Sequence, residues 1–274
     1  MPSQEVLNWL RTRFFPHIWC PGCGHGIIMH ALLRALVDLG KKKEETVIAS
    51  GIGCSSRMPG YIDACTLHTT HGRSLAFATG VKLANPELTV IDVMGDGDCT
   101  AIGGNHFIHA CRRNIDITAI VMNNNIYGMT GGQASPTTPV GAYATTAPYG
   151  VLDVPFDICK LAAGAGASYV ARATVAHPLL IEKYVRNAVS KKGFAVVEVV
   201  THCHTQFGRK NKRPRPIDNI NFFKDNSVMN NKASNMTPEE LQGKIVIGEF
   251  VNIELPEYIE QYMNLIEKVG GNRG

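Results

Sequence analysis

Residues 88–98 read LTVIDVMGDGD, a largely apolar run followed at once by Gly95-Asp96-Gly97-Asp98. A second apolar run, residues 117–122, is followed by Asn123-Asn124-Asn125. We interpret both runs as buried strands joined by a helix over residues 100–112, which makes a βαβ unit. Because the carboxyl ends of parallel strands form the ligand-binding edge of open α/β sheets, Asp96 and Asn124 are expected to lie side by side at that edge.

The two polar segments together resemble the thiamine diphosphate motif, in which GDG is followed, after a spacer, by NN. A diphosphate is bound with Mg²⁺, a hard ion that takes oxygen ligands in a near-octahedral array. Asp96, Asn124 and the backbone carbonyl of Ile126 are the expected ligands, while Gly95 and Gly97 let the backbone approach the phosphates. Either segment alone would be interpreted as an ordinary turn or loop. Their joint occurrence, each after an apolar strand, favours thiamine diphosphate.

The rest of the chain continues the alternation of strands and helices. We predict further strands over residues 46–50, 168–173 and 194–200, and helices over residues 25–39, 74–84, 157–163 and 178–191. Residues 128–150 form a long loop rich in Gly, Thr, Pro and Ala, and loops of this length are usually functional or mobile. The predicted fold class is α/β, a parallel sheet flanked by helices on both faces.

The composition is that of a soluble globular protein. The chain has 274 residues, of which 45% are hydrophobic and 18% charged, enough for one sizeable α/β domain with extensions or for two small domains. A net charge of +4 is too small to indicate a nucleic-acid partner. No apolar stretch reaches the roughly 18 residues of a membrane span, and residues 1–20 lack the apolar core of a signal peptide. We therefore expect a cytoplasmic protein with no membrane partner.

The character of the chain changes from about Thr201, so we divide it into a domain over residues 1–207 and an extension over residues 208–274. The extension begins with the basic segment Arg209–Arg215, which is interrupted by proline. This segment indicates either a solvated surface or a docking site for an acidic electron carrier or for cofactor phosphates. Polar loops and a short helix near residues 256–269 follow. We interpret the extension as an arm that wraps over a partner subunit.

Eight cysteines in a chain expected to be cytoplasmic favour thiols, metal ligands or catalysis over disulfides. Cys20 and Cys23 form a CxxC segment, and Cys54 and Cys203 follow predicted strands whose ends share an edge with Asp96. Four such thiolates suit a [4Fe–4S] cluster or a structural zinc ion. The neighbouring thiamine site favours the iron–sulfur cluster, because that cofactor makes a strongly reducing intermediate. The other cysteines are expected to be small buried hydrophobes: Cys65, Cys99, Cys111 and Cys159.

Taken together, these segments resemble the beta subunit of a 2-oxoacid:ferredoxin oxidoreductase. The matching segments, in colinear order, are WCPGCG (19–24), GIGCSS (51–56), THGR (70–73), GDGD (95–98), NNNIYGMTGGQ (123–133) and Cys203. Beyond about Gly208 no segment contributes to the resemblance. It implies a thiamine diphosphate-binding fold, the module that holds the diphosphate, with a C-terminal extension.

The resemblance also implies roles for the matched residues. The [4Fe–4S] cluster would be held by Cys20, Cys23, Cys54 and Cys203, and Mg²⁺ by Asp96, Asn124 and the Ile126 carbonyl. Gly97, Asp98 and Thr130 would line the diphosphate, and Cys54, Ser55, His71 and Gly72 would lie near the thiazolium and diphosphate. His71 is further expected to polarise the substrate or accept a proton, although an isolated histidine is more often structural.

Arg57 follows Cys54-Ser55-Ser56, at a position where similar proteins carry a basic residue facing the far end of the substrate. A guanidinium there would bind a second carboxylate in a bidentate manner. Gly131 leaves room where some relatives place a lysine. Both features favour 2-oxoglutarate over pyruvate or a broad range of 2-oxoacids. The alternative for Arg57 is an ion pair on a helix surface or at an interface.

The implied reaction is the oxidative decarboxylation of a 2-oxoacid with coenzyme A to acyl-CoA and CO₂, with electrons passing through the cluster to ferredoxin or a ferredoxin-like subunit. The reverse direction would fix CO₂. Thiamine enzymes also need a glutamate from a second α/β module of on the order of 100–200 residues, for which this chain has no room, so an alpha subunit is expected to supply it. The alternatives are a non-redox thiamine decarboxylase or synthase subunit with a structural metal site, and a zinc-stapled scaffold protein.

Overall fold

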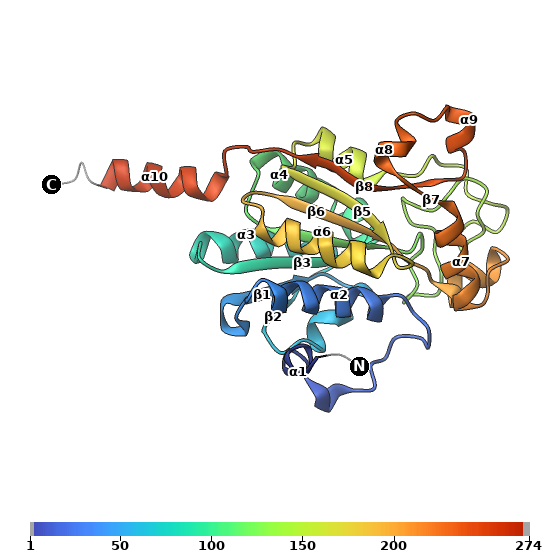
Figure 1. Cartoon of the computed structure of the whole chain (residues 1–274), viewed down its shortest axis with the longest axis horizontal. Coiled ribbons are helices and arrows are strands. Elements are labelled where there is room, and N and C mark those ends of the chain that lie inside the picture. Colours follow the sequence, from blue (N-terminus) through green and yellow to red (C-terminus); the bar gives the residue numbers. More distant parts are fainter. Residues whose placement is uncertain (1–2, 271–274) are drawn as a thin grey trace.

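A computed structural model describes residues 3–270 and contains one eight-stranded sheet of order β2-β1-β3-β4-β6-β5-β8-β7 (Figure 1). Six strands run parallel, as the alternation of strands and helices predicts, and their bounds are β1 Thr46–Ser50, β2 Cys65–His68, β3 Thr89–Gly95, β4 Thr118–Asn123, β5 Tyr169–Thr174 and β6 Ala195–Val200. Strands β3, β4 and β6 lie in the middle of the sheet and are almost wholly buried, which explains why their sequences are nearly continuous apolar runs.

Helices cover both faces of the sheet and make a three-layer structure. Helices α2 (His25–Asp38) and α6 (Pro178–Ser190) pack together on one face, where Leu32 and Val185 belong to the same buried cluster. Helices α3 (Ser74–Ala84), α4 (Gly104–Arg113) and α5 (Ile158–Gly164) cover the other face, and Phe107 anchors the second cluster. The fold class expected from the sequence is therefore confirmed.

The element between β3 and β4 differs from the prediction of one helix over residues 100–112. A π-helical turn spans Asp98–Ile102, and the α-helix begins only at Gly104. The break falls at Gly103, where a Cβ atom would lie 2.2 Å from the carbonyl oxygen of Asp98.

Strand β2 was not predicted, because its four residues alternate too little for a periodic signal.

The C-terminal segment adds two strands that the sequence analysis missed. Strand β8 (Ile245–Asn252) pairs antiparallel with β5, and β7 (Ser227–Met229) pairs parallel with β8. The predicted helix near residues 256–269 is present as α10 (Tyr258–Gly270), and it points away from the rest of the molecule (Figure 1). Residues 1–2 of the predicted domain and 271–274 of the predicted extension lie outside the described residues.

Short elements complete the described chain. They are α1 Gln4–Asn8, α7 Pro216–Asn226, α8 Asn230–Ala233, α9 Pro238–Leu241, and the 3₁₀ or π turns Thr12–Phe14, Lys43–Glu45, Ser55–Gly60 and His204–Gly208. Within residues 3–270, no helix has the length and apolar character needed to cross a membrane.

Candidate active site and cysteine pocket

The four strands that carry the predicted site residues are neighbours in the sheet, in the order β1-β3-β4-β6. Cys54 follows β1, Asp96 follows β3, Asn124 follows β4, and Cys203 follows β6. Because these strands are parallel, all four residues lie at the same edge of the sheet. The structure thus brings together residues that are separated by up to 149 positions in the sequence, counting from Cys54 to Cys203.

A cavity of about 250 Å³ lies at this edge, and we call it the cofactor cavity. Most of the predicted cofactor and Mg²⁺ residues line it: Cys54, Ser55, His71, Asp96, Gly97, Asp98, Asn124, Ile126 and Thr130. Gly72 is the exception, since it does not line the cavity but donates its N–H to Oδ1 of the lining residue Asp98 at 2.6 Å. Tyr127 packs over Gly97, where a Cβ atom would lie 2.2 Å from its ring.

Asp96 is a buried carboxylate whose partners are hydroxyl groups. Oδ2 accepts hydrogen bonds from Ser135 and from Thr137, the latter at 2.7 Å. Burial raises the pKa of Asp96, and the hydroxyl donors only partly oppose that rise. Within the described residues, no lysine or arginine forms an ion pair with this carboxylate. A cation at the cavity would offset the cost of burying its charge.

The Asn123-Asn124-Asn125 segment makes a tight turn at the edge of the cofactor cavity, which Asn124 and Ile126 line. Oδ1 of Asn123 accepts from the N–H of Asn125 at 3.1 Å, and Oδ1 of Asn124 accepts from the N–H of Ile126 at 3.2 Å. Asn125 has a left-handed backbone with a φ of 59°, a conformation that asparagine tolerates better than most residues. This turn explains why asparagine follows β4.

Asp98 holds the other side of the cavity. Its Oδ1 atom lies 2.6 Å from Nδ1 of His71, while Oδ2 is buried without a hydrogen-bond partner among the described residues. Burial raises the pKa of Asp98, and the N–H of Gly72 together with His71 opposes that rise. Asp98 therefore fixes the 71–72 turn and orients the His71 imidazole in the cavity wall.

A second cavity of about 290 Å³, which we call the cysteine pocket, is lined by Cys20, Cys23, Cys54 and Cys203. Arg57 also lines this pocket and does not line the cofactor cavity. Its side chain is exposed and forms no ion pair with any described residue. No ion pair on the surface of this chain is therefore seen for Arg57 among the described residues, and an ion pair at an interface stays a prediction.

The cofactor cavity and the cysteine pocket share a wall that includes Cys54, Asn124 and Gly128. A Cβ atom at Gly128 would lie 3.2 Å from Sγ of Cys203 and 3.8 Å from Sγ of Cys54. Both sulfur atoms thus approach the backbone of the residue that also borders the cofactor cavity. Gly128 therefore lies at the boundary between the two cavities.

The cysteine pocket gathers thiols in partly buried surroundings. Burial raises the pKa of Cys23 to about 12 and that of Cys54 to about 11, and the neighbouring cysteines add to both shifts. Burial lowers the pKa of His25 to about 4, so this histidine is neutral and hydrogen-bonds the thiol of Cys23 at 3.1 Å. Thiolates in this pocket would need a positive charge, such as that of a metal centre.

The remaining cysteines follow the prediction with one exception. Cys99, Cys111 and Cys159 are buried, as expected for small hydrophobic side chains. Cys65 is exposed, because β2 is the edge strand of the sheet and is only partly covered. The expectation that Cys65 is buried was wrong.

Three polar residues that contact Asp96 or Asn123 were missed by the sequence analysis. Ser135 and Thr137 lie in the long loop over residues 128–150 and bind the Asp96 carboxylate. Glu198 lies in the middle of β6, where its side chain accepts a hydrogen bond from Asn123 at 2.8 Å. The loop's content of Ser and Thr and the single acid within the apolar run AVVEVV were the available signals.

Comparison with known proteins places this geometry in a family. Residues 51–199 match the family described as thiamine pyrophosphate enzyme, C-terminal TPP binding domain. The chain is 56% identical over 266 residues to the 2-oxoglutarate synthase subunit KorB of Methanocaldococcus jannaschii, covering 97% of this chain and 98% of the relative. It is 52% identical to the subunit of the same name in Archaeoglobus fulgidus, covering 97% and 95%. The chain belongs to the 2-oxoacid:ferredoxin oxidoreductase family, as a beta subunit.

A solved structure of the family supports the same assignment. The 2-oxoglutarate:ferredoxin oxidoreductase from Magnetococcus marinus, with 2-oxoglutarate, coenzyme A and succinyl-CoA bound, matches with a TM-score of 0.87 and 33% identity. The match covers 100% of this chain and 94% of that chain, so the C-terminal segment belongs to the shared fold. Membership in the family makes this chain one subunit of an oxidoreductase with a thiamine diphosphate domain.

Proposed function

We propose that this subunit binds thiamine diphosphate with Mg²⁺ in the cofactor cavity and a [4Fe–4S] cluster in the cysteine pocket. With these groups it would take part in the conversion of 2-oxoglutarate and coenzyme A to succinyl-CoA and CO₂, with release of one proton and two electrons. The observation that carries the proposal is the shared wall at Cys54, Asn124 and Gly128. A ferredoxin or ferredoxin-like subunit would accept the electrons, and the reverse reaction would fix CO₂.

The donor atoms around Asp96 fit Mg²⁺. A carboxylate, the amide oxygen of Asn124 and the carbonyl of Ile126 are hard oxygen ligands at one edge of the cavity. Gly97, Asp98 and Thr130 remain the residues proposed to line the diphosphate. Thiamine diphosphate, when bound, would supply the carbanion chemistry, and the chain's own residues would position it, with His71 oriented by Asp98 towards the reacting end.

The spacing of the thiols favours a cluster over a single zinc ion. A tetrahedral site with Zn–S bonds of about 2.3 Å holds its sulfur atoms roughly 3.8 Å apart. No three of the four pocket cysteines, all of which are described, have sulfur atoms within 4.8 Å of one another. An iron–sulfur cube places its ligands further apart because four metal ions lie between them. The wider spacing therefore supports a [4Fe–4S] cluster.

We further propose that an alpha subunit completes the active site. The carboxylates that line the cofactor cavity are Asp96 and Asp98, and no glutamate is found among the described residues of that lining. Asp98 is already held by Gly72 and His71. The acid that activates the cofactor would thus come from another chain, and the isolated subunit would be inactive.

Residues 208–274 remain proposed as an arm over the partner, which is supported by the exposed apolar side chains of α10. A cytoplasmic location stays a prediction.

Arg57 is proposed to select 2-oxoglutarate by binding its distal carboxylate. Its exposed guanidinium has no ion pair among the described residues and lies beside Cys54, which borders both cavities. The test is an anaerobic assay of the complete alpha–beta complex with 2-oxoglutarate, pyruvate and a branched 2-oxoacid. We expect 2-oxoglutarate to be preferred, and the Arg57→Met variant to lose that preference. Equal rates for all three substrates in the unaltered complex would contradict this role.

The cluster is tested by replacing the pocket cysteines one at a time with serine in the anaerobically purified complex. Each single replacement should lower the iron content and the visible absorption of the cluster. The four variants are Cys20→Ser, Cys23→Ser, Cys54→Ser and Cys203→Ser. Cys65→Ser is the matched control and should leave both unchanged, because Cys65 is exposed on β2. Zinc in place of iron, or a complex that turns over without iron, would favour a non-redox thiamine enzyme instead.

A further inference from the structure

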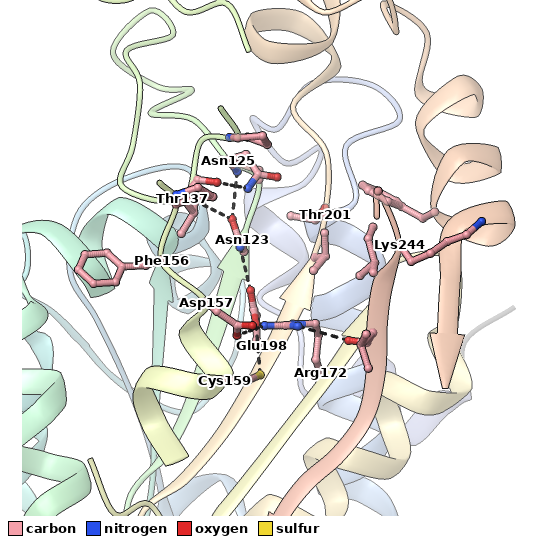
Figure 2. A pocket seen from close by; sticks show the side chains of 18 of the residues that line it. Asn123, Asn125, Thr137, Phe156, Asp157, Cys159, Arg172, Glu198, Thr201 and Lys244 are labelled. Atoms are coloured by element: carbon pink, nitrogen blue, oxygen red, sulfur yellow. Dashed lines mark hydrogen bonds and ion pairs between the residues drawn. The ribbon is translucent and has the colours of Figure 1, made fainter. Parts of the chain in front are cut away.

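A buried hydrogen-bond network begins behind the cofactor cavity and ends at the C-terminal segment. Glu198 on β6 is 2% exposed and lies between Asn123 and Arg172 (Figure 2). Its Oε1 atom accepts from Nδ2 of Asn123 at 2.8 Å, and its Oε2 atom accepts from Nε of Arg172 at 2.6 Å. All three residues line a third cavity of about 850 Å³, which adjoins the cofactor cavity and the cysteine pocket at Asn124.

Arg172 is held on every side by elements from distant parts of the sequence. Its guanidinium donates to Asp157 at 2.5 Å and to the carbonyl of Val246 on β8 at 3.3 Å, and it lies 5.4 Å from the ring centroid of Phe250. Strand β8 therefore fixes the arginine that pairs with Glu198. This contact links the C-terminal segment to the centre of the sheet.

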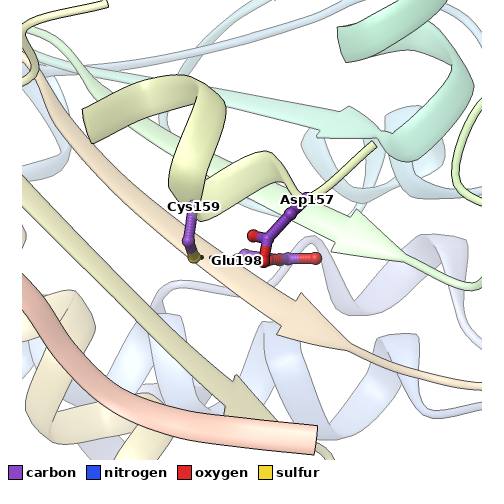
Figure 3. A group of neighbouring side chains, drawn as sticks. All are labelled: Asp157, Cys159 and Glu198. Atoms are coloured by element: carbon purple, nitrogen blue, oxygen red, sulfur yellow. Dashed lines mark hydrogen bonds between the residues drawn. The ribbon is translucent and has the colours of Figure 1, made fainter. Parts of the chain in front are cut away.

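A metal ion is not the best occupant of this network. Ligand atoms of Asp157, Cys159 and Glu198 lie within 4.8 Å of one another, which by itself would suit a cation (Figure 3). The guanidinium of Arg172, however, already contacts Asp157 and Glu198 and supplies the positive charge. Cys159 donates to Glu198 at 3.2 Å, and burial raises its pKa well above the usual range, so it stays a thiol.

Glu198 determines which way the Asn123 amide faces. A carboxylate can only accept hydrogen bonds, so it takes the NH₂ group of Asn123 and turns the amide oxygen in the opposite direction. That oxygen accepts from the N–H of Asn125 at 3.1 Å and lies 3.0 Å from the hydroxyl of Thr137. If the amide were reversed, its NH₂ group would face the N–H of Asn125, and two donors would then meet without an acceptor.

Two routes lead from Asn123 to the expected magnesium ligands. The first is the backbone, because the hydrogen bond to Asn125 holds the left-handed turn on which Asn124 and Ile126 lie. The second is Thr137, whose hydroxyl lies 2.7 Å from Oδ2 of Asp96 as well as beside Asn123. The hydroxyl has one proton to donate, so its hydrogen bond to Asp96 depends on which atom of the Asn123 amide faces it.

We propose that Glu198 and Arg172 are positioning residues for the Mg²⁺ ligands Asp96, Asn124 and Ile126, acting through Asn123 and Thr137. The inference rests on the proposed binding of Mg²⁺ and thiamine diphosphate. Groups that orient metal ligands from the outside typically change metal affinity 10- to 100-fold when they are removed. Strand β8 of the C-terminal segment thereby acts on a site whose ligands lie more than 100 residues earlier in the chain.

The test is the Glu198→Gln variant in the complete alpha–beta complex. Glutamine replaces one carboxylate oxygen with an NH₂ group, so a donor would face either the NH₂ of Asn123 or the guanidinium of Arg172. We expect the dissociation constant of Mg²⁺, measured by calorimetry in the presence of thiamine diphosphate, to rise about tenfold or more. The control is Glu182→Gln, which removes the charge of another buried carboxylate, here paired with the exposed Arg34 at 2.6 Å, at residues that line none of the three cavities.

A folded Glu198→Gln variant with unchanged Mg²⁺ affinity would overturn the inference. If that variant does not fold, Thr137→Val and Thr137→Ser decide, since valine has the shape of threonine without its hydroxyl. Weaker Mg²⁺ binding in Thr137→Val that Thr137→Ser restores would support the inference, and unchanged binding in both would overturn it. An unaltered complex that binds neither Mg²⁺ nor thiamine diphosphate would instead overturn the proposed function, and this inference with it.

Discussion

The Nε atom of Arg172 lies 2.6 Å from Oε2 of Glu198, and the two residues are direct partners across the parallel strands β5 and β6. The carboxylate side chain is 3% exposed and the guanidinium 11%, so neither charge is solvated well by water. A buried charge that loses its partner is costly, whereas an exposed pair contributes little. This difference leads to the first prediction.

Replacing Arg172 with methionine should lower the free energy of unfolding by about 3–5 kcal/mol, because the Glu198 charge would remain buried without its cation. Urea denaturation of the purified chain gives the value. The control is Arg186→Met, which breaks a pair with Asp38 whose side chains are 40% and 42% exposed. That change should cost about 1 kcal/mol or less. Equal effects of the two substitutions would contradict the importance of the buried pair.

Replacing Gly128 with alanine should disturb the cysteine pocket. The new methyl group would lie 3.2 Å from Sγ of Cys203, closer than ordinary van der Waals contact, and 3.8 Å from Sγ of Cys54. We expect a lower iron content or an altered cluster spectrum in the anaerobic complex. Gly80→Ala, on α3 with no atom within 4 Å of the added Cβ, should leave the iron unchanged and stabilise the helix by about 0.5–1 kcal/mol. An unaltered cluster in Gly128→Ala would contradict this prediction, because the sulfur atoms of Cys203 and Cys54 would then have moved to make room for the methyl group.

Replacing Gly97 with alanine should weaken the binding of thiamine diphosphate. Its Cβ atom would lie 2.2 Å from the ring of Tyr127, so the ring that lines the cofactor cavity would have to move. Such overpacking typically costs about 1–3 kcal/mol of stability. Calorimetric titration of the cofactor and urea denaturation measure the two effects. Gly164→Ala, with no atom within 4 Å of its added Cβ, is the control and should bind the cofactor normally.

The stability of the chain should depend on the ionisation of Asp92, which lies buried in β3. Burial raises the pKa of Asp92 well above its usual range, and only the hydroxyl of Ser74, at 2.8 Å, opposes the rise. A raised pKa favours the neutral form in the fold. Its contribution to stability is complete below the unfolded pKa of about 3.9 and is lost as the pH rises through the folded pKa. The Asp92→Asn variant cannot ionise, so its melting temperature should exceed that of the unaltered chain increasingly as the pH rises.

Asp63 supplies a control of the opposite sign. The ammonium of Lys43, at 2.7 Å, lowers the pKa of this half-exposed carboxylate. Its contribution is present above the unfolded pKa and is lost as the pH falls through the folded pKa. Asp63→Asn should therefore reduce stability at neutral pH, and the difference should disappear in acid. If Asp92→Asn and Asp63→Asn showed the same pH trend, the assignment of the Asp92 effect to burial would be wrong.

Much of the fold follows from local patterns in the chain. The helices over residues 25–38, 74–84 and 178–190 are where the apolar periodicity predicts them, and β1, β3, β4, β5 and β6 are where apolar runs predict strands. Strand β8 escaped prediction because it pairs with β5 across more than 70 residues and is only partly buried, so neither a local turn nor a clear alternation marks it.

The pattern of apolar runs followed by polar residues was enough to predict that Cys54, Asp96, Asn124 and Cys203 meet at one edge, because the carboxyl ends of parallel strands share that edge. The order β4, β6, β5 and β8 in the sheet, which places Glu198 between Asn123 and Arg172, could be seen only in the folded chain. A buried charge is stable only beside an oppositely charged or hydrogen-bonding partner. Packing of distant segments decides which strand brings that partner, and the local pattern of residues along the chain does not contain this information.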